Sequence, residues 1–329
     1  MTGAHSPAPG TELAGIRLRI AVVGAGVIGS LYAARLAEAG YEVAVLARGE
    51  RVRSLRDDGI LLEDERSKRR TAIRVAVPET LREFRPDAVL VAVRKDQAGE
   101  AARVLAGDDP GGLVVPMVNA ADGHPEFRSR FPEARLAFAF PGAGGTKLPD
   151  GTVRYTIVPG IVQATTLGPS GPGTDRTILR KLLGAMRDAG FPARLERDMD
   201  AWQKTHVALV SPIADAVYAK AGDHRALARD TRTLRLMASA IRDGFRALRA
   251  SGTAIRPARL GILAVLPAPL VAAAFAPVIG SSWGETVIAR HANAARAEME
   301  MLAGELRALV ESSGAEAPSL RELWARVRG

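Results

Sequence analysis

The sequence at residues 24–48 is GAGVIGSLYAARLAEAGYEVAVLAR, and it decides the fold. Its first six residues, Gly24-Ala25-Gly26-Val27-Ile28-Gly29, fit the pattern GxGxxG. They follow a strand-like apolar run and open a helical pattern that ends at Gly40. In such a loop the first glycine permits a sharp turn, the second lets the backbone approach a pyrophosphate, and the third lets the helix pack on the strand. The helix N-terminus then offers unpaired N–H groups to the anion. We predict dinucleotide binding at this loop; a glycine turn that only packs is the alternative.

An arginine stands where the second strand of this unit ends. The strand-like run 41–48 closes on Leu46-Ala47-Arg48, and Arg51 and Arg53 follow. Proteins that bind NAD usually place an acid here to bind the ribose 2′-hydroxyl. A guanidinium instead binds a 2′-phosphate through paired, charge-assisted hydrogen bonds. The cofactor is therefore predicted to be NADP(H) rather than NAD. Surface arginines are common in this chain, so an ordinary surface charge is the alternative.

The rest of the first half repeats the strand–helix–strand order. Continuous apolar runs at residues 87–93 and 113–119 are typical of parallel strands covered on both faces. Helical patterns occupy residues 50–59 and 95–107. This order predicts an α/β fold with a doubly wound, Rossmann-type parallel sheet.

The pattern changes twice further along the chain. Strands are predicted at 135–140, 152–158, 161–168 and 191–197, with a helix at 176–190. After Asp200 only helical patterns remain, at residues 202–219, 232–252 and 285–314. We therefore expect a dinucleotide-binding domain at 17–197 and an all-helical substrate or dimerisation domain at 198–329, after a disordered leader at 1–16.

Composition limits the class of protein and its partners. The 329 residues include no cysteine, which excludes disulfides and thiolate metal sites and suits a reducing compartment. The first sixteen residues lack the basic start and apolar core of a secretory signal. We expect a cytoplasmic protein with no metal site. The net charge is +9, but the only basic cluster, SKRR at 67–70, lies between two strand-like runs. A solvated turn and an anionic small-molecule ligand are therefore favoured over nucleic acid.

One apolar stretch is long enough to cross a bilayer. No charged residue occurs from Leu260 to Gly284. Prolines at 267, 269 and 277 divide the stretch, and alanines dilute its hydrophobicity. We predict buried helices of the helical domain here and no membrane span.

From about residue 17 onward the chain resembles the ketopantoate reductases, or 2-dehydropantoate 2-reductases. The resemblance rests on GAGVIGSLYAARLAEAG, the LARGERVRSLRDDGI that follows, and VAVRK at 91–95. It continues with AWQKTHV at 201–207, ARAEMEMLAGEL at 295–306 and GAEAPSLREL at 314–323. The order and spacing of these segments are more specific than any one of them.

This resemblance implies reduction of a 2-oxo acid to a 2-hydroxy acid by NADPH. Lys204 would be the catalytic acid, because an ammonium can stabilise and protonate the oxygen that hydride transfer leaves negative. Asn119, at the end of an apolar strand, would bind both cofactor and substrate. The resemblance also implies that three residues bind the cofactor: Arg94, Ala143 and Glu298. Arg94 stands where the family commonly has a lysine. Ser281 or Ser282 would bind the substrate carboxylate.

The sequence departs from the family pattern in its substrate half. Ala208 and Pro212 stand where the family usually has asparagines four and eight residues after the catalytic lysine. Loss of these amides predicts a substrate more apolar than ketopantoate. His206 falls nearly opposite Lys204 on a helix, so we do not expect it to replace a lost asparagine; His291 and Asn293 are weaker polar candidates.

Two other interpretations stay open. One is an NADPH-dependent reductase of a different, more apolar oxo compound. The other is an NADP-binding sensor without catalysis, which the presence of Lys204 disfavours. A homodimer is a further option that the sequence does not decide.

Overall fold

The Rossmann-type sheet has four parallel strands in the order β2-β1-β5-β6. They are β1 (Arg19–Val23), β2 (Glu42–Leu46), β5 (Ala88–Val91) and β6 (Leu113–Pro116). Most of their residues are buried, as expected for a sheet covered on both faces. The computed structural model describes residues 17–281, 284–285, 293 and 295–328, so the predicted leader at 1–16 lies outside the described residues. The predicted parallel α/β architecture is confirmed.

Helices link these strands. They are α1 (Val27–Glu38), α2 (Glu50–Asp57) and α4 (Lys95–Asp108), with short helices α3 (Leu81–Phe84), α5 (Pro125–Arg128) and η1 (Glu133–Arg135) between other elements. The predicted helices at 50–59 and 95–107 are thus present. The loops at the carboxyl ends of β1, β5 and β6 carry Gly24, Arg94 and Asn119, and this edge of the sheet is where open α/β sheets bind ligands.

Two smaller sheets complete the strand-containing lobe. One has the order β11-β10-β7 and the other β4-β3-β9-β8. Their strands are β7 (Ala137–Phe140), β10 (Thr165–Pro169), β11 (Ala193–Leu195), β3 (Ile60–Asp64), β4 (Arg70–Ile73), β8 (Ala143–Lys147) and β9 (Val153–Ile157), and α7 (Arg176–Asp188) lies between β10 and β11.

Two strand predictions need correction here. The strand expected at 161–168 begins only at Thr165, because Gly160–Gln163 form the short helix α6 after Pro159. Strand β8 is absent from the sequence prediction because its two glycines disfavour a strand. Gly145 pairs with Tyr155 of β9, and a Cβ there would lie 2.3 Å from the Arg154 carbonyl oxygen. Glycine at position 145 therefore lets β9 approach closely enough for β8 to form.

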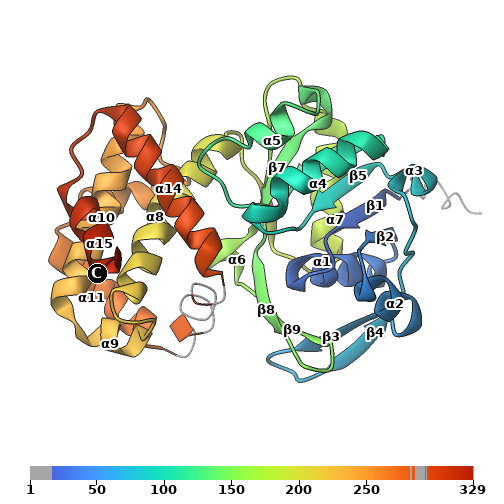
Figure 1. Ribbon diagram of the computed structural model, residues 1–329, viewed down its shortest axis with the longest axis horizontal. Coiled ribbons are helices and arrows are strands. Elements are labelled where there is room, and N and C mark those ends of the chain that lie inside the picture. The colour runs from blue at the N-terminus through green and yellow to red at the C-terminus, as the bar shows by residue number, and fades with distance from the viewer. Residues whose placement is uncertain (1–16, 282–283, 286–292, 294, 329) are drawn as a thin grey trace, which may run out of the picture.

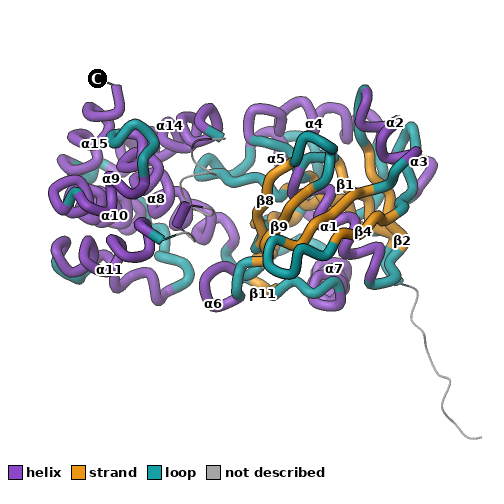
Figure 2. The backbone as a smooth tube through the Cα atoms, turned by 90° about the horizontal axis from the view of Figure 1, so that it is seen from below, coloured by secondary structure: helices purple, strands orange, loops and turns teal. Residues whose placement is uncertain are grey.

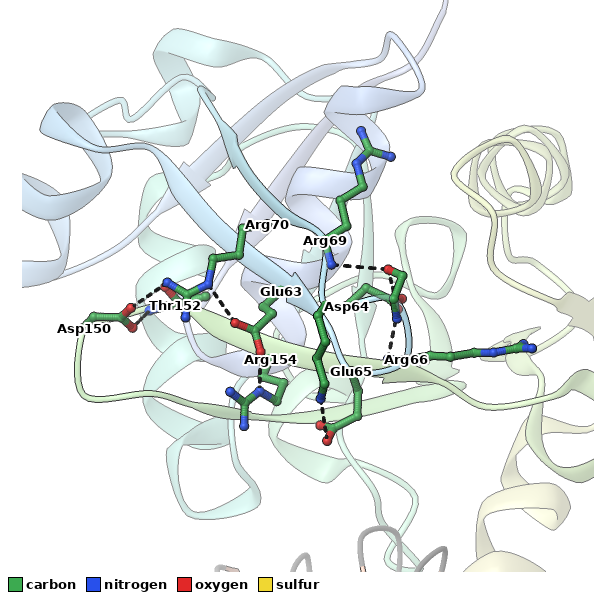
Figure 3. A network of polar contacts seen from close by, with 11 residues as sticks. Glu63, Asp64, Glu65, Arg66, Arg69, Arg70, Asp150, Thr152 and Arg154 are labelled. Atoms are coloured by element: carbon green, nitrogen blue, oxygen red, sulfur yellow. Dashed lines mark hydrogen bonds and ion pairs between the residues drawn. The ribbon is translucent and has the colours of Figure 1, made fainter.

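Glu63 joins three elements of the sheet β4-β3-β9-β8 (Figure 3). Its carboxylate accepts from Arg70 Nε at 2.7 Å and from Arg154 Nε at 2.6 Å, and these arginines hold the pKa of Glu63 below its usual range. Beside it, residues 65–69 link β3 to β4 in a turn in which Asp64 accepts from the backbone of Ser67. Residues 67–69 of the basic cluster thus lie in an exposed turn, as predicted, and Arg70 begins β4 with its side chain 58% exposed.

The second lobe is helical and stands beside the strand-containing lobe in Figures 1 and 2. Its elements are α8 (Met199–Tyr218), α9 (His224–Arg229), α10 (Thr231–Ala250), η2 (Ala258–Ala264), α11 (Ala268–Gly280), α14 (Arg296–Ser313) and α15 (Pro318–Arg328). Among the described residues the last strand ends at Leu195, and α8 begins at Met199. Of the helix predicted at 285–314, α14 covers Arg296–Ser313, and residues 286–292 and 294 lie outside the described residues.

The uncharged stretch 260–284 is less buried than predicted. It forms η2 and α11, which meet at a bend of 118°. Ile262, Val265, Leu270 and Val278 are 42–68% exposed, so the prediction of buried helices is wrong for these side chains, whereas Val271, Ala272 and Ile279 are buried as predicted. Within the described ranges, no one helix has the length and apolar composition to cross a membrane; η2 and α11 together meet that test by length and composition only.

Candidate active site

A cavity of about 1270 Å³ lies between the two lobes. Its floor is the carboxyl edge of the parallel sheet, with Val23, Leu46, Ala92 and Met117 at the strand ends. The opposite wall comes from α8, η2, α11 and α14 of the helical lobe. Because both lobes contribute, a ligand in this cavity would contact the sheet edge and the helices together.

The glycine loop lines the cavity as the sequence predicts, with all of Gly24, Ala25, Gly26, Val27 and Ile28 on its surface. Gly24 has φ +99°, and a Cβ there would lie 2.5 Å from the Ala92 carbonyl oxygen. A Cβ on Gly29 would lie 1.8 Å from the Gly24 carbonyl oxygen. Gly26 has nothing within 4 Å of that position, and no side chain caps α1. Two glycines are therefore required by packing, and Gly26 leaves an open cradle that fits a pyrophosphate.

Arg48 also lines the cavity, beyond the end of β2. Its guanidinium is 67% exposed and lies 3.5 Å from the Glu100 carboxylate. Arg51 lines the same region, and its Nη2 donates to Ser30 Oγ of α1 at 3.2 Å. Burial lowers the pKa of Arg51. Two arginines thus flank the expected ribose position, and Arg53 does not line the cavity.

The predicted cofactor and substrate residues of the sheet edge meet in the cavity. Arg94, at the start of α4, lies 3.2 Å from Asp96 and is exposed. Asn119 is 7% exposed, and its Oδ1 is buried without a hydrogen bond to any residue that the structure describes. Ala143 begins β8 on the same surface. A buried, unpaired amide oxygen facing a cavity fits a ligand group that donates to it.

Glu298 reaches the cavity from the first turn of α14. Burial raises its pKa, the nearby Asp96 carboxylate adds to this, and Arg94 and Lys95 partly offset it. Glu298 therefore lies close to the cofactor-side residues, where the family resemblance implies it.

Lys204 does not reach this cavity. Its Nζ donates to Asp200 Oδ2 at 2.6 Å, one turn earlier on α8, and Lys204 is missing from the residues that line the cavity. The side of α8 that faces the cavity carries Trp202, His206 and Val210. Lys204 is two residues from Trp202 and from His206, so it lies on nearly the opposite side of the helix. The predicted role of Lys204 as an acid in the cleft does not match this arrangement.

The two positions that lack the family's asparagines also face away. Ala208 is fully buried, and a Cβ on Gly244 of α10 would lie 3.2 Å from its methyl carbon. Pro212 is buried on the same side and does not line the cavity. The prediction that their methyl and ring carbons face the substrate is therefore wrong, because α8 turns this side toward α10.

The predicted serines and weaker candidates lie elsewhere. Ser281 Oγ donates to Val278 O at 2.7 Å and accepts from Gly284 N, so it ends α11 rather than lining the cavity. Asn293 donates to Gly222 O. Ser282 and His291 lie outside the described residues.

Among the cavity residues that sequence reasoning missed are His206 and Arg256. His206 lines the cavity although it is not expected to act, and Arg256 lines it from the loop before η2. Trp202 and His206 are one helical turn apart, and this spacing could have indicated that His206 shares the side of α8 on which Trp202 lies. No motif marks Arg256, because its place depends on a tertiary hydrogen bond from its backbone to Thr205 of α8.

Comparison with known proteins supports the fold and family. Residues 20–170 match the family model described as ketopantoate reductase PanE/ApbA. The 2-dehydropantoate 2-reductase of Aquifex aeolicus (strain VF5) is 25% identical over 185 residues, 55% of this chain. The match spans 56% of that protein, little more than half its length.

Solved structures share the whole architecture. A PanE/ApbA family ketopantoate reductase from Ralstonia eutropha JMP134 has a TM-score of 0.71 at 20% identity, over 94% of this chain and 97% of that one. The 2-dehydropantoate 2-reductase of Porphyromonas gingivalis W83 has a TM-score of 0.69 at 18% identity, over 95% and 100%. D-mandelate dehydrogenase, in a ternary structure with NADH and anilino(oxo)acetate, has a TM-score of 0.70 at 14% identity, over 94% and 97%. These likenesses show the fold. In sequence, residues 20–170 match the ketopantoate reductase PanE/ApbA family model.

Proposed function

We propose that this protein is an NADPH-dependent oxidoreductase that reduces a small 2-oxo acid to the 2-hydroxy acid. The observation that carries the proposal is the single cavity, which runs from the glycine loop and Arg48 to the wall of the helical lobe. Its relatives are named for a keto/hydroxy pair, as a 2-dehydropantoate reductase or a mandelate dehydrogenase. We also propose residues 17–197 and 198–329 as the two domains. A cytoplasmic location and a homodimer stay predictions.

The residues present can hold the cofactor and the reacting groups. When bound, a reduced nicotinamide would supply a hydride to the carbonyl carbon. The glycine loop and the uncapped start of α1 would bind its pyrophosphate, and Asn119 would face it at the end of β6. Trp202, Phe140 and Ile213 supply apolar walls that exclude water and strengthen electrostatic interactions inside.

These walls also bear on substrate choice. The prediction of a substrate more apolar than ketopantoate no longer rests on Ala208 and Pro212. It rests instead on the cavity side of α8, where Trp202, Leu209 and Val210 present apolar atoms. A hydroxyl buried against them would lose its hydrogen bonds, at a cost of about 1–3 kcal/mol.

A panel of 2-oxo and 3-oxo acids with NADPH tests the function, followed by loss of NADPH absorbance. We expect turnover of apolar 2-oxo acids and weaker turnover of ketopantoate. Tight NADPH binding without turnover of any acid would favour the sensor alternative. Absence of binding to either nicotinamide cofactor would contradict the proposal.

Arg48 is expected to decide which cofactor binds. One or two charge-assisted hydrogen bonds to a 2′-phosphate contribute about 1.5–3 kcal/mol, so NADPH should bind roughly 10- to 100-fold more tightly than NADH. Arg48→Ala should remove most of that difference and leave NADH affinity nearly unchanged. Titration calorimetry with both cofactors measures this. Arg53→Ala is the matched control, because Arg53 is exposed on α2 and does not line the cavity. Equal affinity of the unmutated protein for the two cofactors would rule out the assignment.

A further inference from the structure

We propose that His206 and Arg256 bind the reacting end of the 2-oxo acid, the His206 ring as proton donor to the carbonyl oxygen and the Arg256 guanidinium as anchor of the carboxylate. This inference rests on the proposed function and names the groups that recognise its substrate. Both residues line the cavity from the helical lobe.

The His206 ring is held where the two lobes meet. It stacks on Trp202, with ring centroids 5.2 Å apart and 8° between the planes. It also lies 4.3 Å from the ring of Phe140, which ends β7 just before the loop to Ala143. Trp202 is 2% exposed and therefore fixed. These contacts place an imidazole at the carboxyl edge of the sheet, the region that Asn119 and Ala143 share with the expected nicotinamide.

Arg256 carries a charge that the described residues leave unpaired. Its Nε is buried without a hydrogen-bond partner, and no ion pair joins it to any described carboxylate. Arg256 is half-buried, and a carboxylate entering the cavity would accept from its buried Nε and supply the opposite charge. The planar guanidinium can bind it through two parallel hydrogen bonds.

A hydrogen bond ties the backbone of Arg256 to the residue before His206. Arg256 N donates to Thr205 Oγ1 at 3.0 Å, and Thr205 directly precedes His206 on α8. Thr205 Oγ1 in turn donates to Ala201 O at 2.8 Å, which holds its side chain in place. The loop before η2 is thereby tied to α8 beside the imidazole. In a 2-oxo acid the carbonyl group and the carboxylate are on adjacent carbons. Two side chains from neighbouring segments, His206 and Arg256, can therefore bind one group each.

Two more arginines make this end of the cavity positive. Arg194 of β11 and Arg259 of η2 both line it. Burial lowers the pKa of Arg194, and the neighbouring Arg259 lowers it further. Arg259 Nη2 donates to Ile161 O at 2.7 Å, whereas the backbone of Arg256 is hydrogen-bonded to Thr205 of α8. The local field therefore favours an anion over a neutral substrate.

The reaction balances with these groups. The carbonyl carbon accepts the hydride, its π electron pair moves to the oxygen, and that oxygen takes a proton from the His206 imidazolium. The two electrons come from the reduced nicotinamide that the proposed function supplies. His206 ends neutral and regains its proton from solvent.

Arg256→Gln tests the carboxylate anchor. The probes are 3,3-dimethyl-2-oxobutanoate, which is ketopantoate without its hydroxyl, and the primary amide of the same acid. We expect kcat/KM for the acid to fall about 10- to 100-fold, mainly through KM, while the amide changes little. Arg249→Gln, exposed on α10, is the matched control. An equal loss for acid and amide, or no loss, would overturn the assignment.

A binding measurement tests the anchor without turnover. Calorimetric titration of the acid into the protein with NADP⁺ should show weaker binding in Arg256→Gln, with the affinity for NADP⁺ unchanged. Acid binding that survives the substitution would overturn the anchor. Failure of the unmutated protein to bind NADP⁺ would instead contradict the proposed function, so the two failures are distinguishable.

His206→Gln tests the proton donor against the lysine that the family resemblance implies. We expect kcat to fall by about two to four powers of ten, the usual contribution of a positioned acid, with the NADPH affinity preserved. Lys204→Gln should cause a much smaller loss, because Lys204 is paired with Asp200 outside the cavity. Partial recovery of His206→Gln by added imidazole would support proton donation. A large loss in Lys204→Gln with little change in His206→Gln would overturn the proposal.

Discussion

At the scale of single residues, Asp215 is an acid in the core of the helical lobe. It lies on α8, 6% exposed, near Arg307 of α14 and Trp324 of α15. Burial raises its pKa to about 7, and these two neighbours offset the effect only in part. The native state therefore keeps a proton that the unfolded chain releases near pH 4. Its contribution to stability is fully present below about pH 4 and is lost as the pH rises through about 7.

Asp215→Asn should make stability less dependent on pH. Asparagine cannot ionise, so the variant should be more stable than the unmutated protein at pH 8. A pKa difference of about three corresponds to at most about 4 kcal/mol, and the gap should shrink toward pH 5. Urea unfolding of both proteins at pH 5 and pH 8 measures this. Asp57→Asn, exposed on α2, is the control. The same gap at both pH values would contradict the prediction.

At the scale of one element, two sides of α8 have different roles: one faces the cavity, and the other packs against α10. Trp202, His206 and Val210, spaced four apart, face the cavity. Ala208, on another side, meets α10 at Gly244, where the absence of a side chain allows the helices to approach. The rotation of α8 about its axis is thus set by a contact between small residues on the side away from the cavity.

Ala208→Asn tests this helix direction, because it restores the family's amide. We expect loss of stability rather than better use of ketopantoate. An amide buried against Gly244 would lack partners and overfill the contact, at a cost of about 2 kcal/mol or more. Urea unfolding and kcat/KM for ketopantoate are the measurements. Ala325→Asn, exposed on α15, should cost less than about 0.7 kcal/mol. A tenfold gain in kcat/KM at unchanged stability would show that Ala208 faces the substrate.

At the scale of the whole molecule, one buried cation holds the two lobes together. Lys95 of α4 is 6% exposed, and its Nζ lies 2.9 Å from both Asp122 and Glu305 of α14. Glu305 also accepts from Ala121 N at 2.6 Å. Burial alone would lower the pKa of Lys95, but Glu305 and Asp122 outweigh it and raise that pKa. Lys95 thus serves the lobe contact and does not line the cavity.

Lys95→Met should loosen the lobes. It leaves the Glu305 carboxylate buried and unpaired, and we expect a loss of about 3 kcal/mol, at the low end for such a pair because Asp122 is 33% exposed. Thermal unfolding monitors the loss, and NADPH affinity should fall because α4 and α14 carry opposite cavity walls. Lys68→Met is the control, since that lysine is 62% exposed beside Glu65. Equal effects of the two substitutions would contradict the role of Lys95.

The sequence by itself determined what depends on local order along the chain. Apolar runs, helical periodicity and the spacing of Gly24, Gly26 and Gly29 predict the parallel sheet and its phosphate loop, because neighbouring residues decide turns and strand ends. Arg48 was predicted for the same reason, because it follows a strand whose carboxyl end must reach the ligand edge. Asn119 also follows such a strand, but its role was implied by the family resemblance.

Only the tertiary structure decided which residues of the helical lobe face the cavity. The direction of α8 depends on Gly244, more than thirty residues away, and on Thr205 holding the loop of Arg256. The motif that contains Lys204 and His206 does not reveal which of these two residues faces the cavity. Packing against α10 decides which side of α8 faces the cavity. Only a small residue of α8 can lie against Gly244, so the side that carries Ala208 faces α10 and the opposite side faces the cavity.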